Sequence, residues 1–153
     1  MDKTTKLKLI GTILGVIILV LIIGLPNIER TIKYDGKTYR VGYFGEIDRS
    51  NDKVVLSTYD DFVKYFEYFE KDGEKIISDY NEKFFKKKSL AVIYVITGSG
   101  NTYIEYSEAK VVDDKVTISY NKKTKGEVGT TVMGGYFIVV EVPKDVKEIS
   151  EKE

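Results

Sequence analysis

An uncharged run near the N-terminus constrains this chain more than any other feature of its sequence. Residues 9–25 contain no charged side chain, and only Thr12 and three glycines interrupt their aliphatic residues. As a helix rising about 1.5 Å per residue, the run is about 26 Å long, which is at the short end of what crosses a bilayer. A helix that is apolar around its whole circumference is difficult to bury in so small a protein. The run therefore predicts a transmembrane segment.

The flanks of this run indicate its orientation. Residues 1–8 carry three lysines against one aspartate, so the positive-inside rule predicts a cytoplasmic n-region. A cleaved signal peptide is the alternative, but it needs small residues after the apolar run, and the first alanine of the chain is Ala91. We therefore expect an uncleaved signal-anchor at residues 9–25. It would make this a single-pass cell-membrane protein whose C-terminal domain is extracytoplasmic and whose membrane contact is residues 9–25.

Two missing residue types narrow the possible chemistry. The 153 residues include no His and no Cys, which excludes disulfides, thiol nucleophiles, imidazole bases and the commonest metal ligands. The 24 basic residues balance the 24 acidic ones, so the chain lacks the basic footprint of a nucleic-acid-binding protein. The composition predicts a protein that is not an enzyme and that needs neither cofactor nor metal. Its Lys- and Ile-rich, Trp-free character is typical of a low-GC bacterium.

Residues 57–69 have the pattern of an amphipathic helix. Ser57 and Thr58 offer an N-terminal cap, and aromatic residues follow at helical spacing, so that they share one face. Tyr68 falls off this face and is expected to be exposed. The helix is expected to end near Asp72 and Gly73, and Asn81 is expected to cap a second, shorter helix.

The remainder of the chain has the patterns of strands. Asp35-Gly36 predicts a two-residue hairpin turn, and the almost wholly apolar residues 90–96 predict a central strand. Gly134-Gly135 suggests a bulge or a tight bend in the last strand. We expect a 27–30 tether, a 31–144 domain and a frayed charged tail at 145–153. The predicted fold class is α+β, with an N-terminal transmembrane helix followed by a small antiparallel sheet that has one or two helices packed on one face. The expected strands are 31–34, 37–43, 53–56, 90–96, 102–112, 115–120 and 130–142.

No catalytic constellation is evident among the remaining polar residues. A Ser–Lys pair could act without His, but Ser57 and Ser89 have simpler roles as a cap residue and a strand-entry residue. The lysines at 86–88 suit the end of a helix better than a headgroup site. Residues 98–100 look like a hairpin turn rather than a phosphate-binding loop. Loops on a rigid sheet commonly carry function, so we expect a partner to contact residues 121–129 and 98–101. The candidate partner-binding residues are Lys122, Lys123, Lys125, Glu127, Ser99 and Asn101.

The second half of the chain resembles the C-terminal domain of the PrcB-type family, which is associated with a surface protease complex. The resemblance covers about residues 55–144 and is carried by residues 80–85, 89–93, 98–100 with Tyr103, and 137–144. The strand entry at residues 98–103 lacks the proline of the family pattern. The resemblance implies a non-catalytic exported domain that binds or modulates another exported protein, such as a protease. The alternatives are an exported hydrolase with a carboxylate-based site and a structural cell-envelope protein.

Overall fold

The computed structural model describes residues 33–42, 53–126 and 133–153. All of these residues belong to one compact unit. Strands make up 53% of the described residues and helices 20%. The described elements are β1 (Gly36–Val41), β2 (Lys53–Leu56), α2 (Tyr59–Glu67), α3 (Glu70–Ile77), α4 (Glu82–Phe85), β3 (Lys88–Thr97), β4 (Thr102–Val112), β5 (Lys115–Thr124), β6 (Gly134–Pro143) and β7 (Glu148–Lys152).

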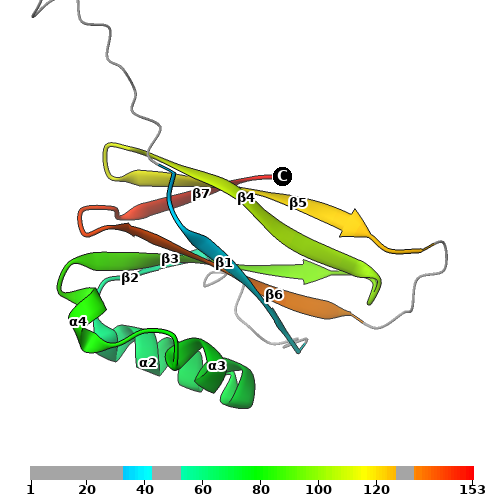
Figure 1. Ribbon diagram of the computed structural model, residues 1–153, viewed down its shortest axis with the longest axis horizontal. Helices are drawn as coiled ribbons and strands as arrows, with labels where there is room; N and C mark the ends of the chain where they lie inside the picture. The colour runs from blue at the N-terminus through cyan, green and yellow to red at the C-terminus, as the bar shows by residue number, and fades with distance from the viewer. Residues whose placement is uncertain (1–32, 43–52, 127–132) are drawn as a thin grey trace, which may run out of the picture. The chain divides into compact units, whose positions relative to one another are not determined.

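The strands are divided between two sheets. Sheet A has four antiparallel strands in the order β1-β6-β3-β2, and sheet B has three strands in the order β4-β5-β7. Within sheet B, β4 and β5 are antiparallel, whereas β5 and β7 are parallel. Figure 1 shows the helices on one side of sheet A and sheet B on the other. The domain therefore has three layers, with sheet A in the middle.

The apolar character of β3 and β6 explains why sheet A is covered on both faces. Along β3, Leu90, Val92 and Tyr94 pack with the helices, while the alternate residues between them pack against sheet B. β6 alternates in the same way, and its neighbours in sequence enter opposite clusters. A strand that is apolar on both faces needs an apolar layer on each side. By contrast, sheet B buries one face and leaves the other polar, as the alternation in β4 predicts.

The helical layer begins where the sequence predicts it. The Thr58 hydroxyl accepts a hydrogen bond of 3.1 Å from the Asp61 N–H, and Phe62 and Phe66 of α2 are fully buried. Asn81 caps α4 by accepting a bond of 3.2 Å from the Phe84 N–H. These N-terminal caps and the aromatic face of α2 are confirmed. Tyr68 is 62% exposed, as expected for a residue off that face.

The helical layer does not end at Gly73 as predicted. Glu70, with a φ of 49°, marks the break between α2 and α3, and α3 continues through Gly73. A side chain at Gly73 would overlap the carbonyl oxygen of Phe66, so glycine is present because α3 passes close to the end of α2. Asp72 accepts a hydrogen bond of 2.8 Å from the Gly42 N–H, which fastens α3 to the end of β1.

The predicted α+β fold class is wrong, because the chain forms two sheets and is mostly β. The strands from 102 to 124 do not extend the first sheet but fold over it, since only one of their faces is apolar and sheet A needs a cover there. The predicted hairpin at Asp35-Gly36 is also wrong. β1 begins at Gly36, and its partner is β6, with Gly36 opposite Val140.

Two smaller predictions about the end of the chain also fail. Gly134 and Gly135 pair regularly with Thr97 and Ile96, without a bulge. Glycine is required at 135 because a Cβ there would lie 2.6 Å from the Gly42 carbonyl oxygen. The tail expected to be frayed contains β7, which buries part of Ile149 against sheet A and pairs along β5.

The membrane predictions are overturned as well. The longest helix that the structure describes, α2, has nine residues and spans about 14 Å, less than half of the roughly 30 Å hydrocarbon core. In the described ranges no helix is both long and apolar enough to cross a membrane. This finding contradicts the predicted single-pass topology and the cell-membrane location with an extracytoplasmic domain. The signal-anchor assigned to 9–25 lies outside the described residues.

Candidate functional site

Four of the predicted partner-binding residues meet at one end of the domain. The turn between β3 and β4 contains Ser99 and Asn101, and the backbone N–H of Lys125 donates a bond of 3.0 Å to the Asn101 carbonyl. This bond ties the end of β5 to the turn. Ser99, Asn101, Tyr103, Lys123 and Lys125 together are called the hairpin-end surface below.

Hydrogen bonds inside the turn hold its shape. The Ser99 carbonyl accepts bonds from the Thr102 N–H at 3.1 Å and from the Thr97 hydroxyl at 3.3 Å. The Ser99 hydroxyl accepts a bond of 3.3 Å from the Asn101 N–H. Behind the turn, the Tyr136 hydroxyl donates a bond of 3.0 Å to the Thr102 carbonyl. The turn is therefore held to the end of β5 by a backbone bond and to sheet A by the hydroxyls of Thr97 and Tyr136.

The lysines of this end differ in how their charges are balanced. Lys123 forms an ion pair with Glu105, and that hydrogen bond raises the pKa of Lys123 above its ordinary value. Lys125 lies over the ring of Tyr103, with its Nζ 5.3 Å from the ring centroid, a cation–π geometry. No carboxylate within the described part of the chain pairs with Lys125. Its positive charge is therefore the one most available to a partner.

The two remaining predicted residues do not join this group. Lys122 pairs with Glu153 at 2.5 Å, beyond the end of β7. Glu127 lies outside the described residues. The loop expected at 121–129 is partly strand, because β5 runs to Thr124 and pairs with β4 as far as Thr102.

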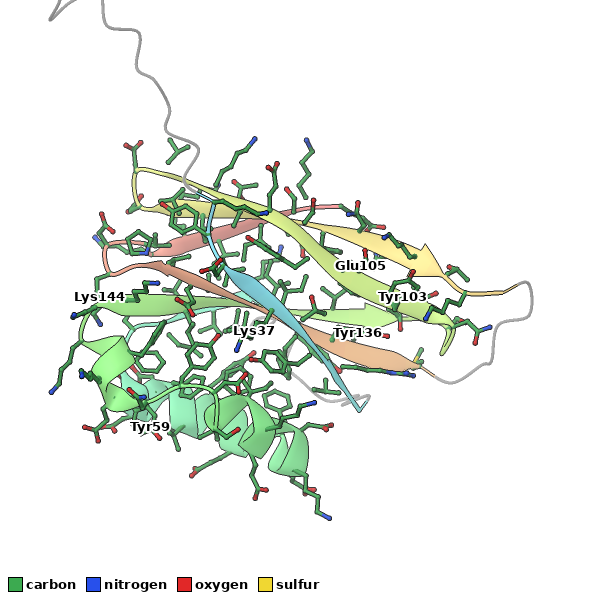
Figure 2. All side chains as sticks on the ribbon, viewed as in Figure 1. Lys37, Tyr59, Tyr103, Glu105, Tyr136 and Lys144 are labelled. Carbon is green, nitrogen blue, oxygen red and sulfur yellow. The ribbon has the colours of Figure 1, made fainter. Side chains whose placement is uncertain are left out.

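Sequence reasoning missed Tyr103 and Tyr136 as parts of this end. Tyr103 is half-buried and packs in part against the cluster between the sheets. It pairs across the sheet with Lys123, so the two residues share one face of sheet B. The alternation of β4 could have identified this, since Tyr103 and Glu105 have the same parity and flank the buried Ile104. Figure 2 shows Tyr103, Glu105 and Tyr136 together at this end, away from Tyr59 and Lys144.

The Ser–Lys pairs considered from the sequence have other partners. The buried Ser89 hydroxyl donates a bond of 3.2 Å to the Ser57 hydroxyl, and Lys88 pairs with Glu141 at 2.7 Å. Lys144 donates a hydrogen bond to the backbone carbonyl of Ser57. None of these contacts joins a lysine amine to a serine hydroxyl. Among the described residues, no three His, Cys, Asp or Glu side chains are grouped so that they could hold a metal ion.

A buried tyrosine marks the junction between β1 and the helical layer. The Tyr39 hydroxyl donates a bond of 2.6 Å to Asp79, which also forms an ion pair of 3.0 Å with Lys37. These partners, Tyr39 first, hold the pKa of Asp79 below its ordinary value. Burial, followed by the bond to Asp79, raises the pKa of Tyr39 far above its ordinary value. Burial also raises the pKa of the adjacent Tyr80 to about 12. The group joins layers rather than lining a cleft.

Comparison with known proteins adds no assignment. No family model, curated protein or solved structure matches the chain. The resemblance to the PrcB-type family therefore stays a prediction.

Proposed function

We propose that the chain is a non-catalytic binding domain that holds another protein through the hairpin-end surface. The observation that carries this proposal is the backbone hydrogen bond from the Lys125 N–H to the Asn101 carbonyl. It holds the turn between β3 and β4 against the end of β5, so that the two form one rigid surface. A surface that is rigid before binding loses little conformational entropy when a partner binds. The modulation of a protease, which the PrcB-type resemblance implies, is one form that such binding could take.

The chemistry of the surface favours an acidic segment of the partner. Lys125 presents a cation beside the Tyr103 ring, and Ser99 and Asn101 add polar groups next to it. An amphipathic ring with an adjacent cation provides contact area and charge recognition together. A carboxylate of the partner would pair with Lys125 while an apolar neighbour packs against Tyr103.

Site-specific crosslinking tests this proposal. A photo-crosslinking aromatic amino acid in place of Tyr103 changes little in size and reports what lies against the surface. The matched control carries the same amino acid in place of Val112, which is 62% exposed at the other end of β4. We expect position 103 to yield one discrete crosslinked species that position 112 does not yield. The same species at both positions, or none at 103, contradicts the proposal.

A charge reversal then tests the role of the lysine. Lys125→Glu should abolish the crosslink at position 103, because the introduced carboxylate repels an acidic segment. Lys110→Glu is the matched control, since Lys110 lies on the same sheet and is exposed. An undiminished crosslink in the Lys125→Glu variant would exclude an acidic partner segment.

A further inference from the structure

An open hollow of about 700 Å³ lies where α4 meets the start of α2. It is shallow and wide open to solvent, so a ligand would lie on its surface rather than inside a closed cleft. Nothing in the proposed function uses this place. Its lining consists of Tyr59, Asn81, Glu82, Lys83, Lys86 and Lys87.

The charge of the lining is mainly positive and is not balanced by ion pairs. Lys83, Lys86 and Lys87 form no ion pair with any carboxylate that the structure describes, whereas the adjacent Lys88 pairs with Glu141. Among the lining residues that the structure describes, Glu82 is the one acidic side chain, so three positive charges stand against one negative charge. Ammonium groups that share one hollow repel each other, and a bound anion removes that repulsion.

The walls of the hollow are held by the core. The Tyr59 ring packs against Phe62 and Phe85, with centroid distances of 6.1 and 6.0 Å. Phe85 is itself buried, which anchors α4. The Asn81 side chain is held by its bond to the Phe84 N–H. A ligand would therefore meet a Tyr59 ring and an Asn81 side chain that are already held in position, in a hollow that three exposed lysines also line.

We propose that this hollow binds a small organic phosphate that carries a planar ring. A phosphate group is compact and multiply charged, so several lysines can donate hydrogen bonds to it at once. The planar part of the ligand would lie against Tyr59.

This site is separate from the hairpin-end surface. The two lie at opposite ends of β3, which begins beside Lys87 and ends at the turn containing Ser99. Ten strand residues span about 33 Å. Each group of lysines can therefore serve as the control for the other.

Calorimetric titration of the full chain tests the proposal with three probes. Adenosine triphosphate carries both a phosphate chain and a ring, pyrophosphate carries the charge alone, and adenosine carries the ring alone. We expect adenosine triphosphate to bind most tightly, pyrophosphate to bind about tenfold more weakly and adenosine to show no measurable binding. The absence of binding by adenosine triphosphate overturns the proposal.

Matched lysine variants locate the site. Replacing Lys83, Lys86 and Lys87 together by Gln should weaken adenosine triphosphate binding at least about tenfold. The same replacement at Lys122, Lys123 and Lys125 should leave binding within about twofold. An equal loss in both variants means that only the overall charge matters, which overturns the site. Circular dichroism checks that each variant is folded; the single variant Lys86→Gln replaces the site variant, and Lys125→Gln the control variant, if either triple variant is not.

A second substitution tests the ring. Tyr59→Leu keeps an apolar side chain against Phe62 and Phe85 but removes the aromatic face. In this variant adenosine triphosphate should bind no more tightly than pyrophosphate, and the affinity for pyrophosphate should be unchanged. If adenosine triphosphate still binds about tenfold more tightly than pyrophosphate, the placement of the ligand ring on Tyr59 is overturned. None of these titrations depends on the crosslink at position 103, so this proposal and the proposed function can fail separately.

Discussion

Replacing Tyr39 with phenylalanine removes one hydroxyl from the junction between β1 and the helical layer. Tyr39 is 8% exposed, and its hydroxyl donates a 2.6 Å bond to the Asp79 carboxylate. A hydrogen bond to a charged group contributes about 1.5–3 kcal/mol to stability. The Asp79 side chain is 37% exposed and keeps its ion pair with Lys37, so solvent screening favours the lower end of that range. We expect Tyr39→Phe to lower the free energy of unfolding by about 1.5 kcal/mol at pH 7.

This loss should depend on pH in a defined direction. The pKa of Asp79 is lowered in the folded state, chiefly by the bond from Tyr39, so the stabilisation requires the ionised carboxylate. It is fully present above the unfolded-state pKa of about 4 and is lost as the pH falls through the lower folded-state value. The difference between the wild type and Tyr39→Phe should therefore shrink as the pH falls below about 4.

Urea unfolding followed by circular dichroism at a series of pH values measures this difference. Tyr136→Phe is the matched control, because Tyr136 is 5% exposed and its hydroxyl donates to the neutral Thr102 carbonyl. Its loss of about 1 kcal/mol should not change across the same pH range. A pH-independent loss for Tyr39→Phe, or a loss below about 0.5 kcal/mol, would refute the reasoning.

Three further predictions concern packing, and urea unfolding measures each. Phe66→Ala should cost about 3–5 kcal/mol because Phe66 is fully buried, whereas Tyr68→Ala at an exposed position should stay within about 0.5 kcal/mol; equal losses would contradict the helix orientation. Gly73→Ala should destabilise by about 1–3 kcal/mol because the new methyl overlaps a backbone carbonyl, although alanine favours helices. Gly98→Ala, with no atom within 4 Å of the new methyl, should be neutral or slightly stabilising. A larger loss of stability in Gly98→Ala than in Gly73→Ala would refute this account. Deleting residues 145–153 should cost several kcal/mol because it removes β7 and a buried valine, whereas a frayed tail would cost nothing.

Local features of the fold could be predicted because their causes lie within a few residues. The cap at Thr58 and the apolar strand around Val92 depend on neighbours in sequence, and both were found where the pattern placed them. β7 could not be predicted in this way, because Ile149 is its one apolar residue. The segment forms a strand only by pairing with β5, which lies far away in the sequence. The same reason applies to Gly36, whose turn signal is overridden by pairing with β6.

The candidate site was partly predictable for a similar reason. Turns and strand ends can be predicted from composition, so Ser99 and Lys125 were identified. The contact of Lys125 with the Tyr103 ring could not be predicted, because it depends on the register in which β4 pairs with β5. The lysines at 86–88 were identified as a helix end. That Lys86 and Lys87 line a hollow together with Lys83 and Tyr59 depends on how α2 and α4 pack, which no local pattern encodes.

The position of β6 inside sheet A has a consequence for how the chain folds. β6 lies between β1 and β3, and it pairs Gly36 with Val140, residues 104 positions apart. Contacts of such sequence separation form slowly, because a long loop must close before they contribute. Until β6 pairs with it, one edge of the almost wholly apolar β3 has no hydrogen-bonding partner. An unpaired apolar strand edge can pair with a strand of another chain, which is how aggregates begin. The time between collapse and the insertion of β6 is therefore the interval in which this protein is most exposed to aggregation.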